Sequence, residues 1–136
     1  MIEEQSFGVI PLRKEGNQWQ VFLIKREKGF WECPKGHSDA GELPLSAAKR
    51  ELFEETGLQV AKLVQQEPLQ IQYFFRVKGA LIKKTVFYYI AEVYGTVKLQ
   101  TEEVHEGRWE TLEAAIALGT YDTIKKVLRD VSALVE

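Results

Sequence analysis

The apolar residues of this chain repeat with two different periods, and segments of the two kinds follow one another along the sequence. The runs SFGVIPLR (6–13) and QWQVFLIKR (18–26) flank the polar turn KEGN, which contains Gly16, so we expect a β-hairpin. Apolar positions three and four residues apart predict a helix over residues 44–56. Strands and helices interleaved in this way predict one sheet covered by helices on both faces, in the α/β or α+β class.

The boundaries of the predicted helix are marked by residues with special backbone properties. Pro44 can occupy the first turn, where its missing N–H costs nothing, and Gly57 can supply the left-handed residue that ends a helix. Residues 29–42 contain four glycines or prolines among fourteen residues, which predicts a loop. The other predicted elements are strands over 58–65, 69–77 and 84–93 and helices over 112–119 and 121–135.

Length and charge limit the kind of site that the chain can carry. At 136 residues it is long enough for one core, so we expect a single domain spanning residues 1–136. A net charge of −2 is too small to attract nucleic acid or a membrane through a long-range field. An anionic ligand must therefore be held by a local cluster of cations.

Cysteine content and hydropathy bear on the compartment of the protein. The single cysteine, Cys33, excludes an intramolecular disulfide framework and any zinc site with two or more thiolates. The first residues show no signal-peptide pattern, and no stretch approaches the roughly 20 apolar residues of a membrane span. We therefore expect a cytoplasmic protein with no membrane partner.

The stretch RELFEE (50–55) crowds three carboxylates onto the predicted helix. Glu51, Glu54 and Glu55 share an arc of roughly 100° because residues three and four apart lie on one helix face. Like charges at this spacing destabilise an isolated helix by about 0.2 to 0.5 kcal/mol per pair. Arg50 can pair with Glu54, but one guanidinium cannot neutralise three carboxylates.

Two interpretations of this acidic face remain open from these residues alone. It can be a solvated surface, which is the common role of charged runs on helices. It can also hold a hard divalent cation, since oxygen ligands without clustered histidines favour magnesium or manganese over zinc or copper.

The spacing of residues before, within and after the predicted helix bears on the choice between these two interpretations. Nine positions form one pattern that starts in the predicted loop and ends after the helix: Gly36, Glu42, Arg50, Glu51, Leu52, Glu54, Glu55, Gly57 and Leu58. This pattern resembles the signature of the Nudix hydrolases at every fixed position. The resemblance implies a Nudix fold, an α/β/α sandwich around a central mixed β-sheet. It also implies Mg²⁺-dependent, or Mn²⁺-dependent, hydrolysis of a nucleoside diphosphate linked to another moiety.

The resemblance also assigns roles to residues of the signature. It implies that Glu55 is the catalytic base, with Glu54 as its rival, and that the backbone carbonyl of Gly36 is a further metal ligand. Hydrolysis of a pyrophosphate needs cations that screen its oxygens and a group that accepts a proton, which these residues would supply. The implied metal-binding and base carboxylates are Glu51, Glu54 and Glu55, and the implied supporting residues are Glu42 and Arg50.

Segments outside the signature resemble one group within the family. FWECPKGH (30–37), KKTVFYYIAEV (83–93) and EEVHEGRWETLEAA (102–115) are similar to the asymmetrical diadenosine tetraphosphate hydrolases. On that likeness Glu103 adds a metal-binding carboxylate from outside the helix. The implied polyphosphate contacts are Lys35, His37 and Lys84, with Lys83 as an adjacent candidate, and the implied adenine-stacking residues are Tyr73 and Tyr121.

Each of these assignments has a structural alternative. His37 can cap the loop, Lys83 and Lys84 can form a solvated turn, and Tyr73 can pack in the core or at an edge. One departure from the pattern is Ser38-Asp39, where relatives commonly place a glutamate before the second glycine. Because Asp is shorter by one methylene, a ligand role at this position is in doubt.

The leading hypothesis is hydrolysis of diadenosine tetraphosphate into ATP and AMP. Alternatives are an RNA 5′-pyrophosphohydrolase, a diphosphoinositol polyphosphate hydrolase and a nucleotide sensor without turnover. An inositol substrate needs a denser cationic pocket than this nearly neutral chain displays, and the intact signature argues against a sensor. We expect a small nucleotide as partner and no nucleic acid other than RNA 5′ ends; the sequence gives no oligomeric state.

Overall fold

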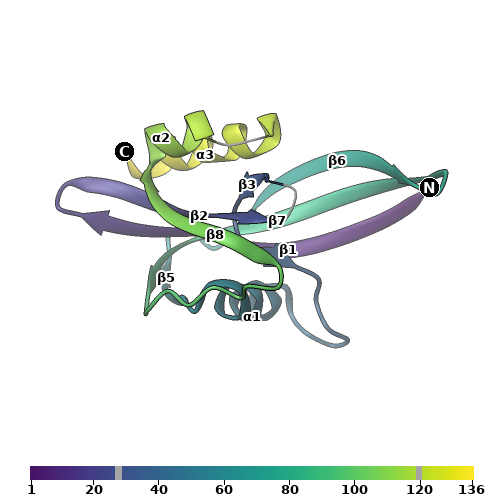
Figure 1. The fold of residues 1–136 in the computed structure, drawn as a ribbon, viewed down its shortest axis with the longest axis horizontal. Coiled ribbons are helices and arrows are strands. Elements are labelled where there is room, and N and C mark those ends of the chain that lie inside the picture. Colours follow the sequence, from purple (N-terminus) through teal and green to yellow (C-terminus); the bar gives the residue numbers. More distant parts are fainter. Residues whose placement is uncertain (27–28, 119–120) are drawn as a thin grey trace.

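The computed structural model describes residues 1–26, 29–118 and 121–136, drawn as a ribbon in Figure 1. In chain order the elements are β1 (Ile2–Glu15), β2 (Gln18–Arg26), β3 (Trp31–Glu32), β4 (Lys35–Gly36), α1 (Pro44–Thr56), β5 (Gln59–Leu63), β6 (Leu69–Val77), β7 (Ala80–Tyr94), β8 (Val104–Thr111), α2 (Leu112–Leu118) and α3 (Asp122–Val135).

The strands form one mixed sheet. Its central path is β3-β2-β1-β7-β5, while β4 pairs with β1, β6 with β7 and β8 with β2. The pairing of β1 with β7 is parallel, from Ile2 opposite Ile82 to Leu12 opposite Glu92, and the other described pairings are antiparallel. The two longest strands therefore run side by side through the middle of the sheet.

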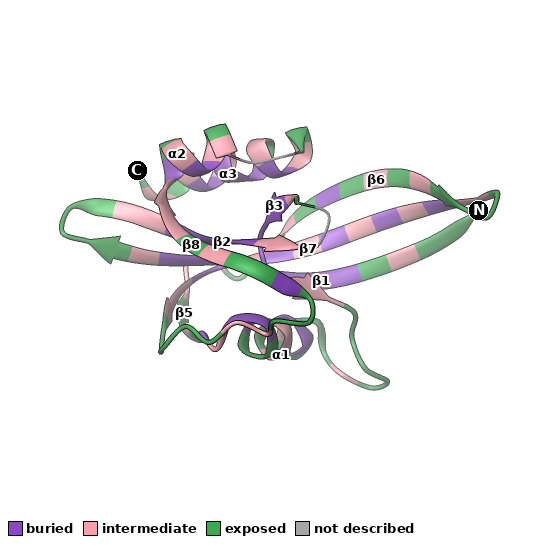
Figure 2. Ribbon diagram, viewed as in Figure 1, coloured by how far each residue is buried: buried purple, intermediate pink, exposed green. Residues whose placement is uncertain are grey.

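Helices cover both faces of this sheet, as the sequence predicts. Helix α1 lies on one face, and α2 and α3 lie together on the other (Figure 1). Because side chains alternate along a strand, Val9 of β1 packs with the α1 cluster and Ile10 with the α3 cluster. Figure 2 shows the buried residues on the sides of the helices that face the sheet. The architecture is the three-layered α/β/α sandwich.

Helix α1 begins and ends where its sequence predicts. Pro44 occupies its first position, and Gly57 takes the left-handed conformation with φ 80°. The Gly57 N–H donates to the carbonyl of Phe53 at 2.9 Å, which closes the last turn. Ala47, Ala48 and Leu52 are fully buried against the sheet. Of the acidic residues of RELFEE, Glu54 is exposed and Glu51 partly so, whereas Glu55 is itself buried.

Most of the other predicted elements are confirmed, with longer strands at two places. The hairpin of β1 and β2 is present, but β1 begins at Ile2 instead of residue 6. Strand β7 extends the predicted 84–93 to Ala80–Tyr94, whereas β5 is shorter than predicted. Helix α2 ends at Leu118; residue 119 of the predicted helix 112–119 lies outside the described residues.

The prediction of a loop throughout residues 29–42 is wrong at two points. Trp31–Glu32 forms β3 against β2, and Lys35–Gly36 forms β4 against β1. Strands of two residues are too short to show a hydrophobic period, so sequence patterns do not reveal them. The short pairings fix the residues between them against the sheet.

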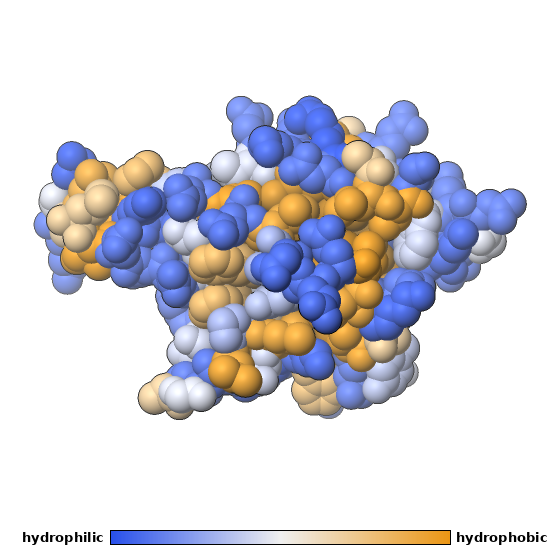
Figure 3. Space-filling view, turned by 180° about the vertical axis from the view of Figure 1, so that it is seen from behind, coloured by the Kyte–Doolittle hydropathy of each residue, from blue (hydrophilic) through white to orange (hydrophobic). Residues whose placement is uncertain are grey.

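Two further observations complete the fold. No helix within residues 1–26, 29–118 and 121–136 is long and apolar enough to cross a membrane. Figure 3, which views the molecule from behind, shows apolar side chains gathered across the middle of that face, with hydrophilic ones around and among them.

Candidate functional site

Arg50 is the centre of the ion pairs on the acidic face of α1. Its Nε and Nη2 bind both oxygens of Glu42 at 2.9 and 3.0 Å, a bidentate pairing. Its Nη1 lies 3.0 Å from Glu51 Oε1 and 3.1 Å from Glu54 Oε2. Nη2 also donates to the carbonyl of His37 at 2.9 Å. One guanidinium therefore binds three of the predicted carboxylates and ties the preceding loop to the helix.

Glu42 closes the loop that leads into α1. Its Oε1 accepts the Asp39 N–H at 2.9 Å, and the hydrogen bond from Arg50 lowers the pKa of Glu42 below its ordinary value. The Asp39 side chain is 77% exposed and its Oδ2 lies 3.6 Å from Arg50 Nε. The shorter acid at this position therefore lies at the edge of the Arg50 cluster.

The Glu51 carboxylate lies directly against Gly36, in the space that a side chain at position 36 would fill. A Cβ atom added at Gly36 would lie 2.2 Å from Glu51 Cδ, so any other residue would displace the carboxylate. Burial raises the pKa of Glu51, and the charges of Glu54 and Glu103 raise it further against the opposing effect of Arg50. Gly36 therefore provides the space in which the Glu51 carboxylate lies.

Two hydrogen bonds of Gln100 tie the segment that contains Glu103 to the end of α1. The Gln100 N–H donates to the carbonyl of Glu55 at 3.1 Å, and the Glu103 N–H donates to the side chain of Gln100 at 2.8 Å. The segment before β8 is thereby held at the end of α1. Glu103 is thus positioned by Gln100, three residues earlier, which in turn binds the backbone of α1.

Glu55 is the most enclosed of the signature carboxylates, with a side chain 4% exposed. Its Oε2 lies 2.8 Å from Arg26 Nη2, and its Oε1 accepts the backbone N–H of Lys35 at 3.1 Å. Burial raises the pKa of Glu55 to about 7, although Arg26 acts in the opposite direction. Glu54, in contrast, has a side chain 53% exposed and lies open to water.

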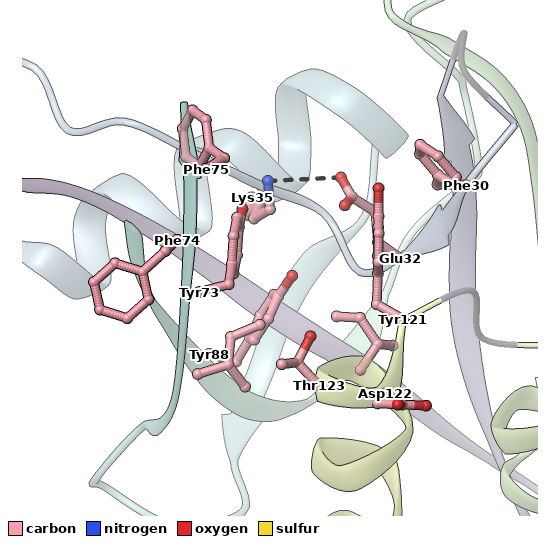
Figure 4. Close-up of a pocket in the computed structure, with 12 residues that line it drawn as sticks. Phe30, Glu32, Lys35, Tyr73, Phe74, Phe75, Tyr88, Tyr121, Asp122 and Thr123 are labelled. Carbon is pink, nitrogen blue, oxygen red and sulfur yellow. Dashed lines mark ion pairs between the residues drawn. The ribbon is translucent and has the colours of Figure 1, made fainter. Parts of the chain in front are cut away.

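Arg26 extends the ion pairs away from the helix. Its Nε donates to Glu32 Oε1 in a close contact, and its Nη2 donates to the Lys35 carbonyl at 3.2 Å. The Lys35 ammonium in turn lies 3.7 Å from Glu32, the ion pair drawn as a dashed line in Figure 4. Two acids and two bases thus form a continuous chain from Glu55 to Lys35.

Two of the predicted phosphate contacts, His37 after β4 and Lys84 of β7, lie next to each other. Lys84 Nζ lies 3.2 Å from His37 Nε2, and both lie within 3.9 Å of Glu4. Burial lowers the pKa of Lys84, and the neighbouring charge of Lys35 lowers it further. Lys35, His37 and Lys84 are therefore brought together.

Lys83 is separated from this group by strand alternation. Along β7, Ile82 and Lys84 are buried on one face, and Lys83 projects to the other. Its Nζ pairs with Glu3 at 3.9 Å. Lys83 is thus the one predicted phosphate contact that the described structure does not bring to Lys35 and His37.

An aromatic cleft of about 630 Å³ lies beside these cations, on the face of the sheet that carries α3. Tyr73 of β6 and Tyr121 before α3 line it from different sides (Figure 4). The Phe30 and Tyr121 rings are 4.8 Å apart, and those of Tyr73 and Phe75 are 6.1 Å apart. Glu32 and Lys35 lie at the same cleft, so it adjoins the ion pairs of Arg26.

The donor set of the α1 face fits a hard divalent cation. Every candidate is a carboxylate or carbonyl oxygen, and Gly36 leaves the space that Glu51 occupies. Among residues 1–26, 29–118 and 121–136, no three acidic, histidine or cysteine side chains converge as they stand on a point that could hold an ion. Guanidinium nitrogens of Arg50 and Arg26 now bind the carboxylates that an ion would draw together.

Sequence reasoning missed Arg26, Glu32 and Phe30. Glu32 had a usable signal, because it stands in a loop rich in glycine and proline just before the signature. Arg26 ends an ordinary amphipathic strand and carries no signal of its own. Only the pairing of β2 with β3 brings it beside Glu32.

Comparison with protein families and known proteins gives consistent matches. The family model described as the NUDIX domain matches residues 3–131. A mouse asymmetrical bis(5′-nucleosyl)-tetraphosphatase is 36% identical over 128 residues, which cover 90% of this chain and 84% of the mouse protein. An RNA pyrophosphohydrolase of Mesorhizobium japonicum is 49% identical over 73 residues, 48% of this chain and 42% of that protein.

A solved structure is similar over almost the whole chain. The Ap4A hydrolase binary complex of Caenorhabditis elegans has a TM-score of 0.73 and 26% sequence identity, with 95% of each chain covered.

Proposed function

This chain belongs to the NUDIX domain family and is a hydrolase, and on that premise we propose that it cleaves dinucleoside polyphosphates, diadenosine tetraphosphate first among them, into ATP and AMP. The observation that carries the proposal is the contact between an aromatic cleft and a helix face of carboxylates through Lys35. A base and a phosphate chain joined to it could then bind at the same time.

The aromatic cleft would bind one adenine. Tyr73 and Tyr121 present ring faces from different elements, and stacking on such rings contributes about 1 to 3 kcal/mol per base. Phe30 packs on Tyr121 and holds its ring in place. Stacking alone does not choose among bases, so other dinucleoside polyphosphates should also be accepted.

Lys35, His37 and Lys84 would bind the phosphate chain next to the cleft. The Lys35 and Lys84 ammonium groups are compact charges suited to phosphate oxygens, and His37 lies 3.2 Å from Lys84. Glu32 pairs with Lys35, and Glu4 pairs with Lys84. The substrate's phosphates would replace these acids as partners of the lysines.

The carboxylates of Glu51, Glu54, Glu55 and Glu103, with the Gly36 carbonyl, would hold Mg²⁺, or Mn²⁺ in its place. When bound, the metal screens the phosphate oxygens and stabilises the charge of the leaving group. Gly36 lets the Glu51 carboxylate lie against backbone, and Arg50 orients the acidic face. A cation between these carboxylates would offset their mutual repulsion, which adds to burial in raising the pKa of Glu51.

The reaction needs a group that takes a proton from water. The water oxygen bonds to a phosphorus of the chain as the anhydride P–O bond breaks, and a glutamate accepts the released proton. We assign this role to Glu55, which is held by two donors, with Glu54 as its rival because Glu54 is open to water.

RNA 5′ ends are the second candidate substrate. The observation in favour is the 49% identity to an RNA pyrophosphohydrolase, although it covers only 48% of this chain. Both candidates would use the same glutamates and differ in what binds beyond the first phosphates. A basic strip leading away from the site, which RNA binding favours, is not evident in a chain with net charge −2.

The test is to incubate the protein with Mg²⁺ and, in parallel, diadenosine tetraphosphate, triphosphorylated RNA and ADP-ribose, and to separate the products chromatographically. We expect equal amounts of ATP and AMP from diadenosine tetraphosphate and slower conversion of the others. If RNA is converted and diadenosine tetraphosphate is not, the substrate assignment is wrong. If nothing is converted although AMP binds, the protein is a nucleotide sensor.

A further inference from the structure

We propose that Arg26 is a positioning residue of the reaction, which holds Glu55 and Lys35 in a fixed relation where the α1 face meets the aromatic cleft. The proposal rests on the proposed function, because it takes Glu55 as a working carboxylate and Lys35 as a phosphate contact. Arg26 lies outside the signature, at the end of β2, and acts through these two residues.

Three residues form a closed ring of hydrogen bonds. Arg26 Nη2 lies 2.8 Å from Glu55 Oε2 and donates to the Lys35 carbonyl at 3.2 Å. The Lys35 N–H donates to the second oxygen of Glu55 at 3.1 Å. Each member therefore contacts the other two, and both carboxylate oxygens of Glu55 are fixed in direction.

Glu32 holds Arg26 from the other side. Its carboxylate accepts from Arg26 Nε, and its side chain is only 11% exposed. With Nε bound to Glu32 and Nη2 bound to Glu55, the plane of the guanidinium is determined. Glu32 also lies 3.7 Å from the Lys35 ammonium, so it links the orientation of Arg26 to the cation beside the cleft.

The charge balance of this group supports a constant orientation. Burial alone would lower the pKa of Arg26, but the charges of Glu55 and Glu32 outweigh it and raise the pKa above its ordinary value. A guanidinium is in any case protonated in proteins, so it can bind both carboxylates at once. Two acids face two bases, so the group has no net charge to repel the phosphate chain.

The geometry requires an arginine and not merely a positive charge. A lysine carries one ammonium and cannot present two nitrogens in one plane toward Glu32 and Glu55. If Arg26 contributed charge alone, Arg26→Lys would preserve activity. A residue that orients a working side chain typically changes activity or metal affinity by about 10- to 100-fold when it is replaced.

The experiment compares Arg26→Gln and Arg26→Lys with Arg13→Gln. Arg13 is a matched control, because it is a partly buried strand arginine that binds Gln20 and Glu15 and packs on Trp109, away from the site. We expect kcat for diadenosine tetraphosphate to fall about 10- to 100-fold in both Arg26 variants. Arg13→Gln should keep kcat within about twofold of the wild-type value, since surface substitutions of this kind have small effects.

Three further measurements separate positioning from a loss of fold. AMP binding without metal reports the aromatic cleft and should be unchanged in Arg26→Lys. Mg²⁺ affinity by calorimetry without substrate should weaken about 10-fold or more. Thermal melting identifies any variant that does not fold. If Arg26→Gln does not fold, it is replaced by the double variant Arg26→Gln with Glu32→Gln, which removes both charges of the ion pair together.

A double-mutant cycle with Glu55→Gln gives the decisive result. If Arg26 acts through Glu55, Arg26→Lys should lower kcat by less than about threefold when Glu55 is already replaced. Full additivity of the two losses overturns the proposal, and so does wild-type kcat in Arg26→Lys. A wild-type protein that hydrolyses none of the tested nucleotides contradicts the proposed function instead, and the Mg²⁺ affinities still decide the role of Arg26.

Discussion

The acidic face of α1 and the aromatic cleft lie on opposite faces of one sheet, and they are built in different ways. The acidic face comes from one helix and the loop before it, with Arg50 bound to Glu42, Glu51 and Glu54. The cleft takes its rings from separate segments, including Phe30, Tyr73 and Tyr121. The first depends on local spacing along the chain, whereas the second exists only after the sheet and α3 have come together.

This difference teaches that the reaction and the choice of substrate can change independently. An aromatic ring of the cleft can be replaced without altering the spacing of the carboxylates on α1. A replaced glutamate leaves the rings of the cleft in place. The two regions meet at Lys35, whose N–H binds Glu55 and whose side chain lines the cleft.

The largest expected effect comes from Glu54→Gln, which alters the acidic face alone. We expect kcat for diadenosine tetraphosphate to fall by about 10² to 10⁴, because the amide neither holds a cation nor accepts a proton as a carboxylate does. The dissociation constant of AMP, measured by calorimetry, should stay within about twofold of the wild-type value. A large loss of AMP binding would contradict the independence of the two regions.

Gly36→Ala is expected to give the next largest effect. Its Cβ would overlap Glu51, whose flexible carboxylate can move aside without unfolding the chain. For the wild-type protein, Mg²⁺ at a hundred times its dissociation constant should raise the free energy of unfolding by about 2.7 kcal/mol. At the same Mg²⁺ concentration, the free energy of unfolding of Gly36→Ala should rise by less than that of the wild type. Denaturant titration with and without the metal measures both increases. An equal gain in both proteins would mean that Glu51 takes no part in binding the ion.

Tyr121→Ala should weaken nucleotide binding and leave metal binding unchanged, the reverse of the two variants above. Loss of one stacking ring should weaken AMP binding by about 5- to 150-fold, equivalent to about 1 to 3 kcal/mol. The stabilisation by Mg²⁺ should be unchanged, since the ring belongs to the cleft. Tyr121→Phe is the matched control, because it keeps the ring that packs on Phe30. Equal losses in both variants would point to the hydroxyl instead of the ring.

The smallest effect is expected for Tyr88→Phe, because Tyr88 lines the cleft but keeps its ring when only the hydroxyl is removed. Tyr88 is fully buried in β7, and its hydroxyl donates to the Cys33 carbonyl at 3.4 Å. Its removal should lower the free energy of unfolding by about 1 kcal/mol, measured by denaturant titration. Both kcat and AMP binding should remain as in the wild type, and a change in either would mean that the Tyr88 hydroxyl takes part in substrate binding.

The same contrast explains how much could be predicted from the sequence. Helix α1 was predictable to the residue because Pro44 and Gly57 determine its ends locally. Strand β8 was not, because charged residues and a glycine interrupt the alternation in VHEGRWET. Its pairing with β2 depends on partners about eighty residues earlier in the chain, which no local pattern contains.

The candidate site divides along the same line. The signature positions from Gly36 to Leu58 could be recognised from their spacing in the sequence. In the structure, Arg50 binds Glu42, Glu51 and Glu54. The pairing of Arg26 with Glu55 and Glu32 joins residues on three different elements. Adjacent lysines look equivalent in sequence, but strand pleating sends Lys83 and Lys84 to opposite faces.

The parallel pairing of β1 with β7 also sets an order for folding during synthesis. The ribosome releases β1 first, yet its parallel partners, from Ile82 to Glu92, emerge only after more than half of the chain has been made. Until then β1 can pair with β2 and β4, while its long edge toward β7 stays exposed. Contacts this distant in sequence slow folding, so the middle of the sheet can form only after β7 has been made.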